Sequence, residues 1–178
     1  MKQVGFNREM LEILSNMKGK VFNSILYEDD DFTSFGNVAI KVDDKILEIT
    51  NREDMDGFDE EYESSHFSCK YVDEFVSVVN NAVIKEKEVN EVIEAVNIVT
   101  DKINIDEEDY HIEYDMAVEI ITPNHKYTIA RNYFYSEVIT LHIDEDMDKI
   151  YSIEKVERDW QNEEETLHIE IERDVKKI

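Results

Sequence analysis

The sequence is poor in the residues that cross-link or interrupt small folds. Its 178 residues include one cysteine, one proline and four glycines. The lone Cys69 excludes an internal disulfide bond, which removes one argument for an extracellular protein and favours the cytoplasm. With so little glycine and proline, no flexible linker or low-complexity segment is visible. We therefore expect a single domain over residues 1–178, with a hydrophobic core of its own.

Long apolar runs and basic residues are also scarce. The N-terminal pattern is charged and amphipathic, so we expect neither a signal peptide nor a membrane span. Lysine and arginine total 19 against 44 acidic residues, which gives a formal net charge of −25 at pH 7. Such a charge repels phosphates and anionic lipids, and it speeds encounters with a basic partner. We therefore expect a basic protein partner, with no direct nucleic-acid or membrane binding; the alternative is that the charge serves solubility alone.

Alternating apolar and polar residues between positions 112 and 144 form the clearest structural pattern. From Ile112 to Ile120 every second residue is apolar, which predicts a half-buried strand. A turn around Pro123 separates this strand from a return strand over 126–135 and a third strand over 137–144. These residues predict a β-meander.

Further strands are predicted on both sides of the meander. They cover residues 20–27, 37–43, 45–51 and 65–71. The segments 37–71 and 112–144 resemble each other, which leaves a duplicated meander open. A final hairpin is predicted from residues 150–160 and 166–174.

Helical spacing of apolar residues predicts a helix over 7–17, capped by Asn7, and a central amphipathic helix over 89–103. Residues 72–83 fit a helix slightly better than two strands around a tight turn. The predicted fold is α+β: mainly antiparallel sheet in meanders and hairpins, as two packed or barrel-like sheets, with an N-terminal and a central helix.

Acidic clusters are the main candidate binding surface. If several converge on one face, they present fixed negative charge to a protein that normally grips a phosphate backbone. The candidate residues are Asp29, Asp30, Asp31, Asp54, Asp56, Asp59, Glu60, Glu61, Asp144, Glu145, Asp146, Glu170 and Glu172.

Two histidines provide an alternative site. His142 and His168 each stand in a Leu-His-Ile triplet, with a carboxylate two residues later. Imidazole and carboxylate are suitable ligands for zinc or a non-haem metal, provided that the two strands are neighbours. A calcium loop at residues 52–63 is a weaker candidate, because Arg52 stands at the first ligand position.

Motifs of the familiar enzyme classes are missing from the sequence, which has no glycine-rich phosphate loop, serine-nucleophile elbow or cysteine pair. His66 and Cys69 would face opposite sides of a strand, so we expect a buried structural cysteine. We expect no cofactor. The leading hypothesis is a non-enzymatic inhibitor of a basic, nucleic-acid-handling protein, of the antitoxin, immunity or anti-defence type. A metal-binding domain or metal-dependent hydrolase, and a small-ligand barrel with a tyrosine-lined pocket, are the alternatives.

Overall fold

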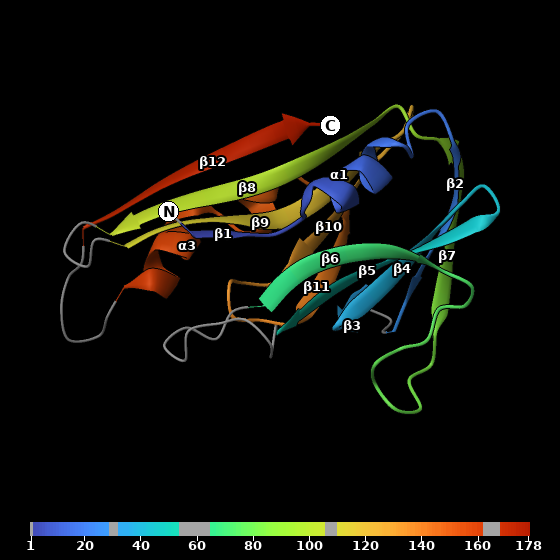
Figure 1. Ribbon diagram of the computed structural model, residues 1–178, viewed down its shortest axis with the longest axis horizontal. Coiled ribbons are helices and arrows are strands. Elements are labelled where there is room, and N and C mark those ends of the chain that lie inside the picture. Colours follow the sequence, from blue (N-terminus) through green and yellow to red (C-terminus); the bar gives the residue numbers. More distant parts are fainter. Residues whose placement is uncertain (1, 29–31, 54–64, 106–109, 162–167) are drawn as a thin grey trace.

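The computed structural model describes residues 2–28, 32–53, 65–105, 110–161 and 168–178, which form two β-sheets and short helices (Figure 1). The first sheet contains β1 (Lys2–Val4), β3 (Thr33–Phe35), β8 (Ala95–Ile105), β9 (Tyr110–Ile121), β10 (Lys126–Arg131), β11 (Val138–Ile143) and β12 (Ile169–Lys177). Its strand order is β12-β8-β9-β10-β11-β3. Strand β1 joins β9 in parallel, whereas the neighbours along this order are antiparallel.

The second sheet is antiparallel and contains β2 (Val21–Tyr27), β4 (Asn37–Val42), β5 (Lys45–Glu53), β6 (Ser65–Val72) and β7 (Lys85–Val92). Its order is β6-β5-β4-β2-β7. The predicted α+β class with a mainly antiparallel sheet is therefore confirmed. Among the described strands neither sheet closes on itself, so the packed-sheet alternative holds and the barrel alternative does not.

The main core lies between the two sheets. Apolar residues on the facing sides of both sheets are buried together: Phe22, Ile40, Leu47, Ile49, Val118, Ile120, Ile129 and Ile139. Burying a side chain of this size stabilises the fold by about 1.5–3 kcal/mol, so this layer is the main source of cohesion between the sheets.

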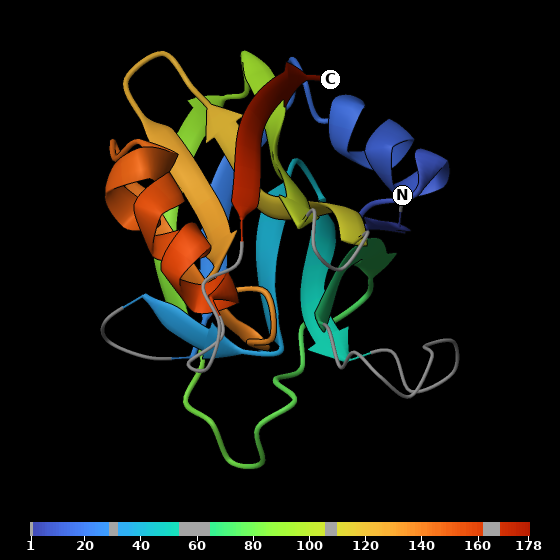
Figure 2. The ribbon, with the colours of Figure 1, turned by 90° about the vertical axis from the view of Figure 1, so that its left-hand side faces the viewer.

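Helix α1 (Arg8–Ser15) adds Leu14 to the main core and has the predicted cap, because Asn7 Oδ1 accepts the Met10 N–H at 3.0 Å. Helices α2 (Met147–Ile150) and α3 (Ile153–Trp160) cover the other face of the first sheet (Figure 2). There Val156 packs into a second core with Val99 and Ala117. The first sheet is thus buried on two faces.

The predicted central helix is wrong, because residues 85–92 form β7 of the second sheet and residues 95–105 form β8 of the first. Adjacent β8 residues contribute to different cores: Ile98 to the layer between the sheets, and Val99 to the layer under α2 and α3. A strand that is buried on both faces no longer alternates apolar and polar residues. Its apolar residues then also fit the spacing of a helix. The high content of β-branched residues was the signal that favoured strands.

Two further predictions are corrected. Residues 73–84 form neither a helix nor a hairpin but an irregular connection between β6 and β7. The first half of the predicted final hairpin is helical, since residues 153–160 form α3 and Ser152 Oγ accepts the Lys155 N–H at 3.3 Å. The second half is a strand, β12. The signal for α3 was Ser152 before apolar residues at helical spacing.

The two predicted meanders are both present, one in each sheet. Strands β4, β5 and β6 are successive antiparallel neighbours in one sheet, and β9, β10 and β11 are in the other. Their origin by duplication stays a prediction.

Candidate functional site

Many predicted acidic site residues lie outside the described residues. These are Asp29, Asp30, Asp31, Asp54, Asp56, Asp59, Glu60 and Glu61. The core of the candidate calcium loop, residues 54–63, also lies outside them.

A second predicted cluster follows β11 and is held by bonds to the start of β10. Asp144 accepts the Lys126 N–H at 2.9 Å and pairs with His125 Nδ1 at 2.7 Å. Asp146 accepts from Lys126 Nζ at 2.7 Å. The backbone bond from Lys126, followed by the His125 bond, lowers the pKa of Asp144, and the Lys126 ammonium lowers the pKa of Asp146. Both carboxylates are therefore oriented anions, partly balanced by a local cation.

The remaining predicted acids lie on β12. Glu170 and Glu172 are exposed there, and Glu172 stands opposite Lys102 of β8. Three strands separate β12 from β11, which amounts to about 19 Å across the sheet. Helix α2, which follows β11, nevertheless reaches β12, because Asp148 Oδ1 accepts from Arg173 Nη1 at 2.8 Å. The predicted acids that the structure describes thus stand on two elements, β12 and the segment after β11, and a shared acidic surface stays a prediction.

The same separation applies to the two histidines. His142 lies on β11 and His168 immediately precedes β12, so their rings are too far apart to bind one metal ion. His142 instead lies near Thr140 Oγ1 at 3.0 Å and Glu145 at 3.8 Å, and burial lowers its pKa. Within the described ranges, no three His, Cys, Asp or Glu side chains are grouped as metal ligands.

Cys69 is buried on β6, as predicted. His66 lies three residues earlier on the same strand and therefore faces the other side of the sheet. Burial raises the pKa of the Cys69 thiol to about 12, so the sulfur is protonated at neutral pH. A buried thiol is a poor nucleophile, and this pair does not form a catalytic dyad.

An exposed apolar surface was not predicted as a site. Residues 73–84, hereafter the valine loop, carry the exposed side chains of Val76, Val79, Val83 and Ile84, and Phe35 at the end of β3 is exposed as well. Val76 is 66% exposed and Val83 is 70% exposed. A shallow cavity of about 280 Å³ adjoins Phe35 and Val79. The signal in the sequence is the density of valine, although its spacing predicts a helix.

Polar bonds hold the valine loop in place from beneath. Asn37 is 1% exposed; its Nδ2 donates to Val76 O at 2.9 Å, and its Oδ1 accepts the Val78 N–H at 3.3 Å. Glu28 accepts from the Ser77 hydroxyl and from the Phe35 N–H. The valines thus lie on a loop that is tied to Asn37 of β4 and to Glu28, which follows β2.

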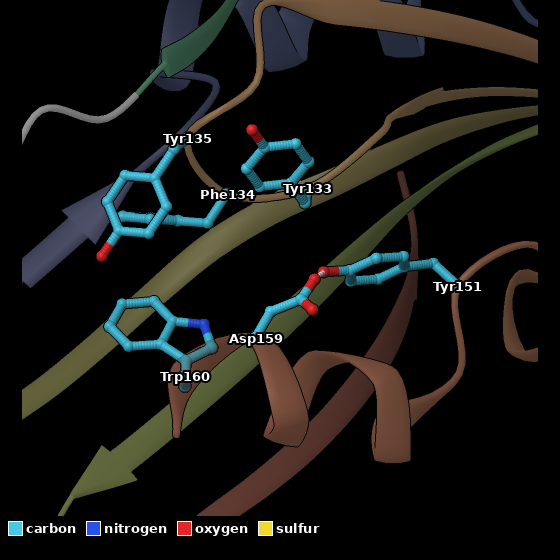
Figure 3. Close-up of a pocket in the computed structure, with 6 residues that line it drawn as sticks. All are labelled: Tyr133, Phe134, Tyr135, Tyr151, Asp159 and Trp160. Carbon is cyan, nitrogen blue, oxygen red and sulfur yellow. Dashed lines mark hydrogen bonds between the residues drawn. The ribbon is translucent and has the colours of Figure 1, made fainter. Parts of the chain in front are cut away.

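A pocket lined mainly by aromatic rings is the second feature that the sequence did not predict (Figure 3). It holds about 270 Å³, and we call it the aromatic pocket. The loop between β10 and β11 supplies one wall, and the residues at and before α3 supply the other. Its lining residues are Tyr133, Phe134, Tyr135, Tyr151, Asp159 and Trp160.

Ring packing positions the first wall of the aromatic pocket. Phe134 is buried, with its centroid 4.8 Å from that of Tyr114 and 5.0 Å from that of Trp160. Tyr133 and Tyr135 on either side are 40% and 41% exposed. Buried Phe134 therefore anchors the triplet, while its neighbours reach the surface.

A buried ion pair positions the second wall. Arg173 donates to both carboxylate oxygens of Asp101 at 2.7 Å, and also to Tyr151 O at 2.7 Å. The Tyr151 hydroxyl donates to Asp159, as Figure 3 shows. Burial, followed by the Asp159 carboxylate, raises the pKa of Tyr151, so this phenol stays protonated. Asp159 is exposed and brings a carboxylate to the rim.

The described residues define an acidic α+β protein with two surface features, the exposed valine loop and the aromatic pocket. Comparisons of the chain with protein-family models, curated proteins and solved structures found no match. In the part of the chain that the structure describes, no helix is both long and apolar enough to cross a membrane.

The aromatic pocket had a signal in the sequence, the consecutive triplet Tyr133-Phe134-Tyr135 after the strand over 126–131. The predicted tyrosine-lined pocket belongs to a barrel, which the described strands do not form. The aromatic pocket is a different feature, because it lies between a loop and helix α3, whose residues the sequence predicts to be a strand.

Proposed function

We propose that this protein is a non-enzymatic binding protein that neutralises a basic, nucleic-acid-handling partner, in the manner of an antitoxin, an immunity protein or an inhibitor of a nuclease. The exposed and tethered valine loop carries the proposal. A cytoplasmic location, expected from the single cysteine, is part of it.

The valine loop supports protein binding because apolar side chains that are exposed together commonly mark a protein-interaction site, and this one segment exposes four of them. Val76 and Val83 are among the most exposed large apolar residues in the described ranges. Interfaces commonly have an apolar centre with a polar rim, and the exposed acids Asp73 and Glu74 begin this loop. The tether through Asn37 lowers the entropy that binding would otherwise cost.

The charge supports a basic partner. Several described basic groups already have internal acidic partners, including Lys41 with Glu86, Lys126 with Asp146 and Arg173 with Asp101. Because acids outnumber bases by 44 to 19, a large acidic excess remains for the surface. Attraction of this kind accelerates association and weakens with added salt.

The test is affinity capture with the purified protein at low and high salt, followed by identification of the bound proteins. We expect nucleic-acid-binding proteins of high isoelectric point to be retained at low salt and released at high salt. The double variant Val76→Ser/Val83→Ser should no longer retain these proteins at low salt, since its loop has lost the apolar contacts.

The matched control is Val21→Ser with Val92→Ser. These valines are also exposed, and they pair across β2 and β7, away from the valine loop. Retention by the control and loss by the loop variant would support the proposal. Equal retention by both variants, or recovery of no basic protein at low salt, would refute it.

A further inference from the structure

We propose that the aromatic pocket binds an organic cation, namely the guanidinium or alkylammonium head group of an arginine or lysine side chain. This site lies on different elements from the valine loop and does not depend on the partner proposed above. It rests on the rings of the pocket, the Asp159 carboxylate and the size of the cavity.

Aromatic faces and one carboxylate are the groups that recognise such a cation. The face of an aromatic ring carries partial negative charge and attracts a cation within about 6 Å of its centroid. In Figure 3 the ring of Tyr133 lies across the pocket from Trp160 and Asp159. A guanidinium between these walls would stack on rings and donate to the carboxylate, the two contacts for which its planar shape is suited.

The molecule already places its own cations on aromatic rings next to this site. Lys155 Nζ lies 4.5 Å from the centroid of the Tyr151 ring. The Arg131 guanidinium lies 5.0 Å from the Phe67 centroid and 5.6 Å from the Tyr114 centroid. Arg131 Nη1 also approaches Phe134 O at 3.5 Å, so this internal example adjoins the wall of the pocket.

Volume and charge restrict the occupant further. Pockets for drug-sized ligands usually measure about 300–1,000 Å³. The 270 Å³ of the aromatic pocket is slightly smaller, which suits one side chain or a small amine. A net charge of −25 concentrates cations near the surface and repels nucleotides, whose bases would otherwise fit an aromatic site. Lys155, Arg131 and Arg173 are the opposing positive charges described above; Arg173 is paired with Asp101, and Lys155 lies on one ring, that of Tyr151.

The first experiment is a fluorescence titration of the full chain, because Trp160 is the single tryptophan and lines the pocket. The ligands are acetyl-arginine amide and its uncharged analogue, acetyl-citrulline amide. We expect the arginine compound to bind roughly tenfold more tightly, since it alone makes cation–π and charge-assisted contacts. Equal responses to both ligands, or no change with either at tens of millimolar, would overturn the proposal.

Two further ligands distinguish the source of the cation. Ethylguanidinium is the free head group, whereas a Gly-Arg-Gly peptide presents it on a peptide chain. Tighter binding of the peptide identifies a protein side chain as the occupant. Tighter binding of ethylguanidinium contradicts that source.

Matched variants localise the effect. Asp159→Asn keeps an oxygen for the Tyr151 hydroxyl but removes the negative charge, and we expect roughly tenfold weaker binding of acetyl-arginine amide. Glu157→Gln is the control, an equal charge change at an exposed position of α3 outside the pocket lining. Equal affinities of the two variants would assign binding to the overall charge and reject the pocket.

Tyr133→Leu gives an independent check if Asp159→Asn fails to fold. Tyr133 is partly exposed, so its replacement spares the core while it removes one ring. We expect weaker binding of acetyl-arginine amide and an unchanged response to acetyl-citrulline amide. An unchanged response to the arginine compound would contradict the assignment of the ring wall.

Discussion

Arg131 shows how this protein stabilises charge inside its core. Its side chain is fully buried, and Nη1 donates to Ser65 O at 3.0 Å. Nε and Nη2 have no hydrogen-bond partner among the described residues, and the rings of Phe67 and Tyr114 flank the guanidinium. Burial lowers the pKa of Arg131 to about 10, so it remains a cation at neutral pH. Ring faces therefore replace part of its hydration.

Asp115 is the corresponding buried anion on β9. Its two oxygens accept the Phe6 N–H and the Thr100 hydroxyl, each at 2.8 Å. Burial nevertheless raises its pKa, since desolvation outweighs these two bonds. A Cβ at Gly5 would collide with this carboxylate, so glycine is required at that position.

Asp115 yields a prediction about pH. The folded protein protonates it more readily than the unfolded chain does, so its contribution to stability is full below about pH 3.9 and is lost as pH rises through the higher folded pKa. Asp115→Asn does not titrate. Its free energy of unfolding relative to the wild type should therefore increase from acidic to neutral pH in urea titrations. A difference that stays constant with pH would contradict this account.

Among the structural elements, the valine loop shows a local pattern overridden by tertiary bonds. Its apolar residues lie at helical spacing, yet Asn37 and Glu28 bind the backbone amide, carbonyl and hydroxyl groups of residues 76–78 and hold the chain in an irregular course. The loop also packs closely on β3 and β4, because a Cβ at Gly36 would lie 2.8 Å from the Val78 side chain. Helical spacing alone does not produce a helix where other groups bind the backbone.

Asn37→Ala tests this tether. The variant loses two hydrogen bonds to the loop and one to Glu48. Because Asn37 is buried, we expect the free energy of unfolding to fall by about 1–3 kcal/mol. Amide exchange at residues 76–79 should accelerate while β5 stays protected. The control Asn124→Ala removes an exposed side chain that is hydrogen-bonded to Glu91. It should lower the free energy of unfolding by less than about 0.5 kcal/mol. Equal losses in the two variants would show that Asn37 does not specifically hold the loop.

At the scale of the whole molecule, charge opposes folding. A net charge of −25 on 178 residues makes the compact state self-repulsive, and the internal ion pairs offset only part of that repulsion. Salt screens charges over about 30 Å at 0.01 M and about 8 Å at 0.15 M. Salt should therefore act on stability in a definite direction.

We expect sodium chloride to stabilise the protein. Raising it from about 0.01 M to about 0.15 M should increase the free energy of unfolding by about 1 kcal/mol, or the Tm by roughly 2–4 °C for a chain of this size. Thermal unfolding followed by circular dichroism measures this change. A Tm that falls with salt would mean that the favourable ion pairs outweigh the repulsion.

How well the sequence predicted the fold depended on how many faces of an element are buried. The meander over 112–144 and the strands over 37–71 were predicted well, because turns and alternation mark strands with one buried face. The capped helix near Asn7 was also predicted. Residues 85–105 were not, since both faces of β8 are buried and the alternation disappears.

The candidate sites were less predictable, because they depend on contacts between distant segments. Local sequence contained Tyr133-Phe134-Tyr135 and Trp160 but not their proximity. It also contained His142 and His168, which stand in the same Leu-His-Ile triplet. The strand order nevertheless places them far apart. Strand order is not encoded in local periodicity, so neither outcome was available from the sequence.

The sequence by itself determined the acidic charge, the mainly antiparallel class, the N-terminal helix and the two meanders, because composition, alternation and turn residues act locally. Only the tertiary structure decided that residues 85–92 and 95–105 are strands of different sheets and that Val76, Val79 and Val83 are exposed. It also decided that a loop and α3 enclose an aromatic pocket. These outcomes depend on which faces are buried and which chain segments meet, and long-range packing sets both.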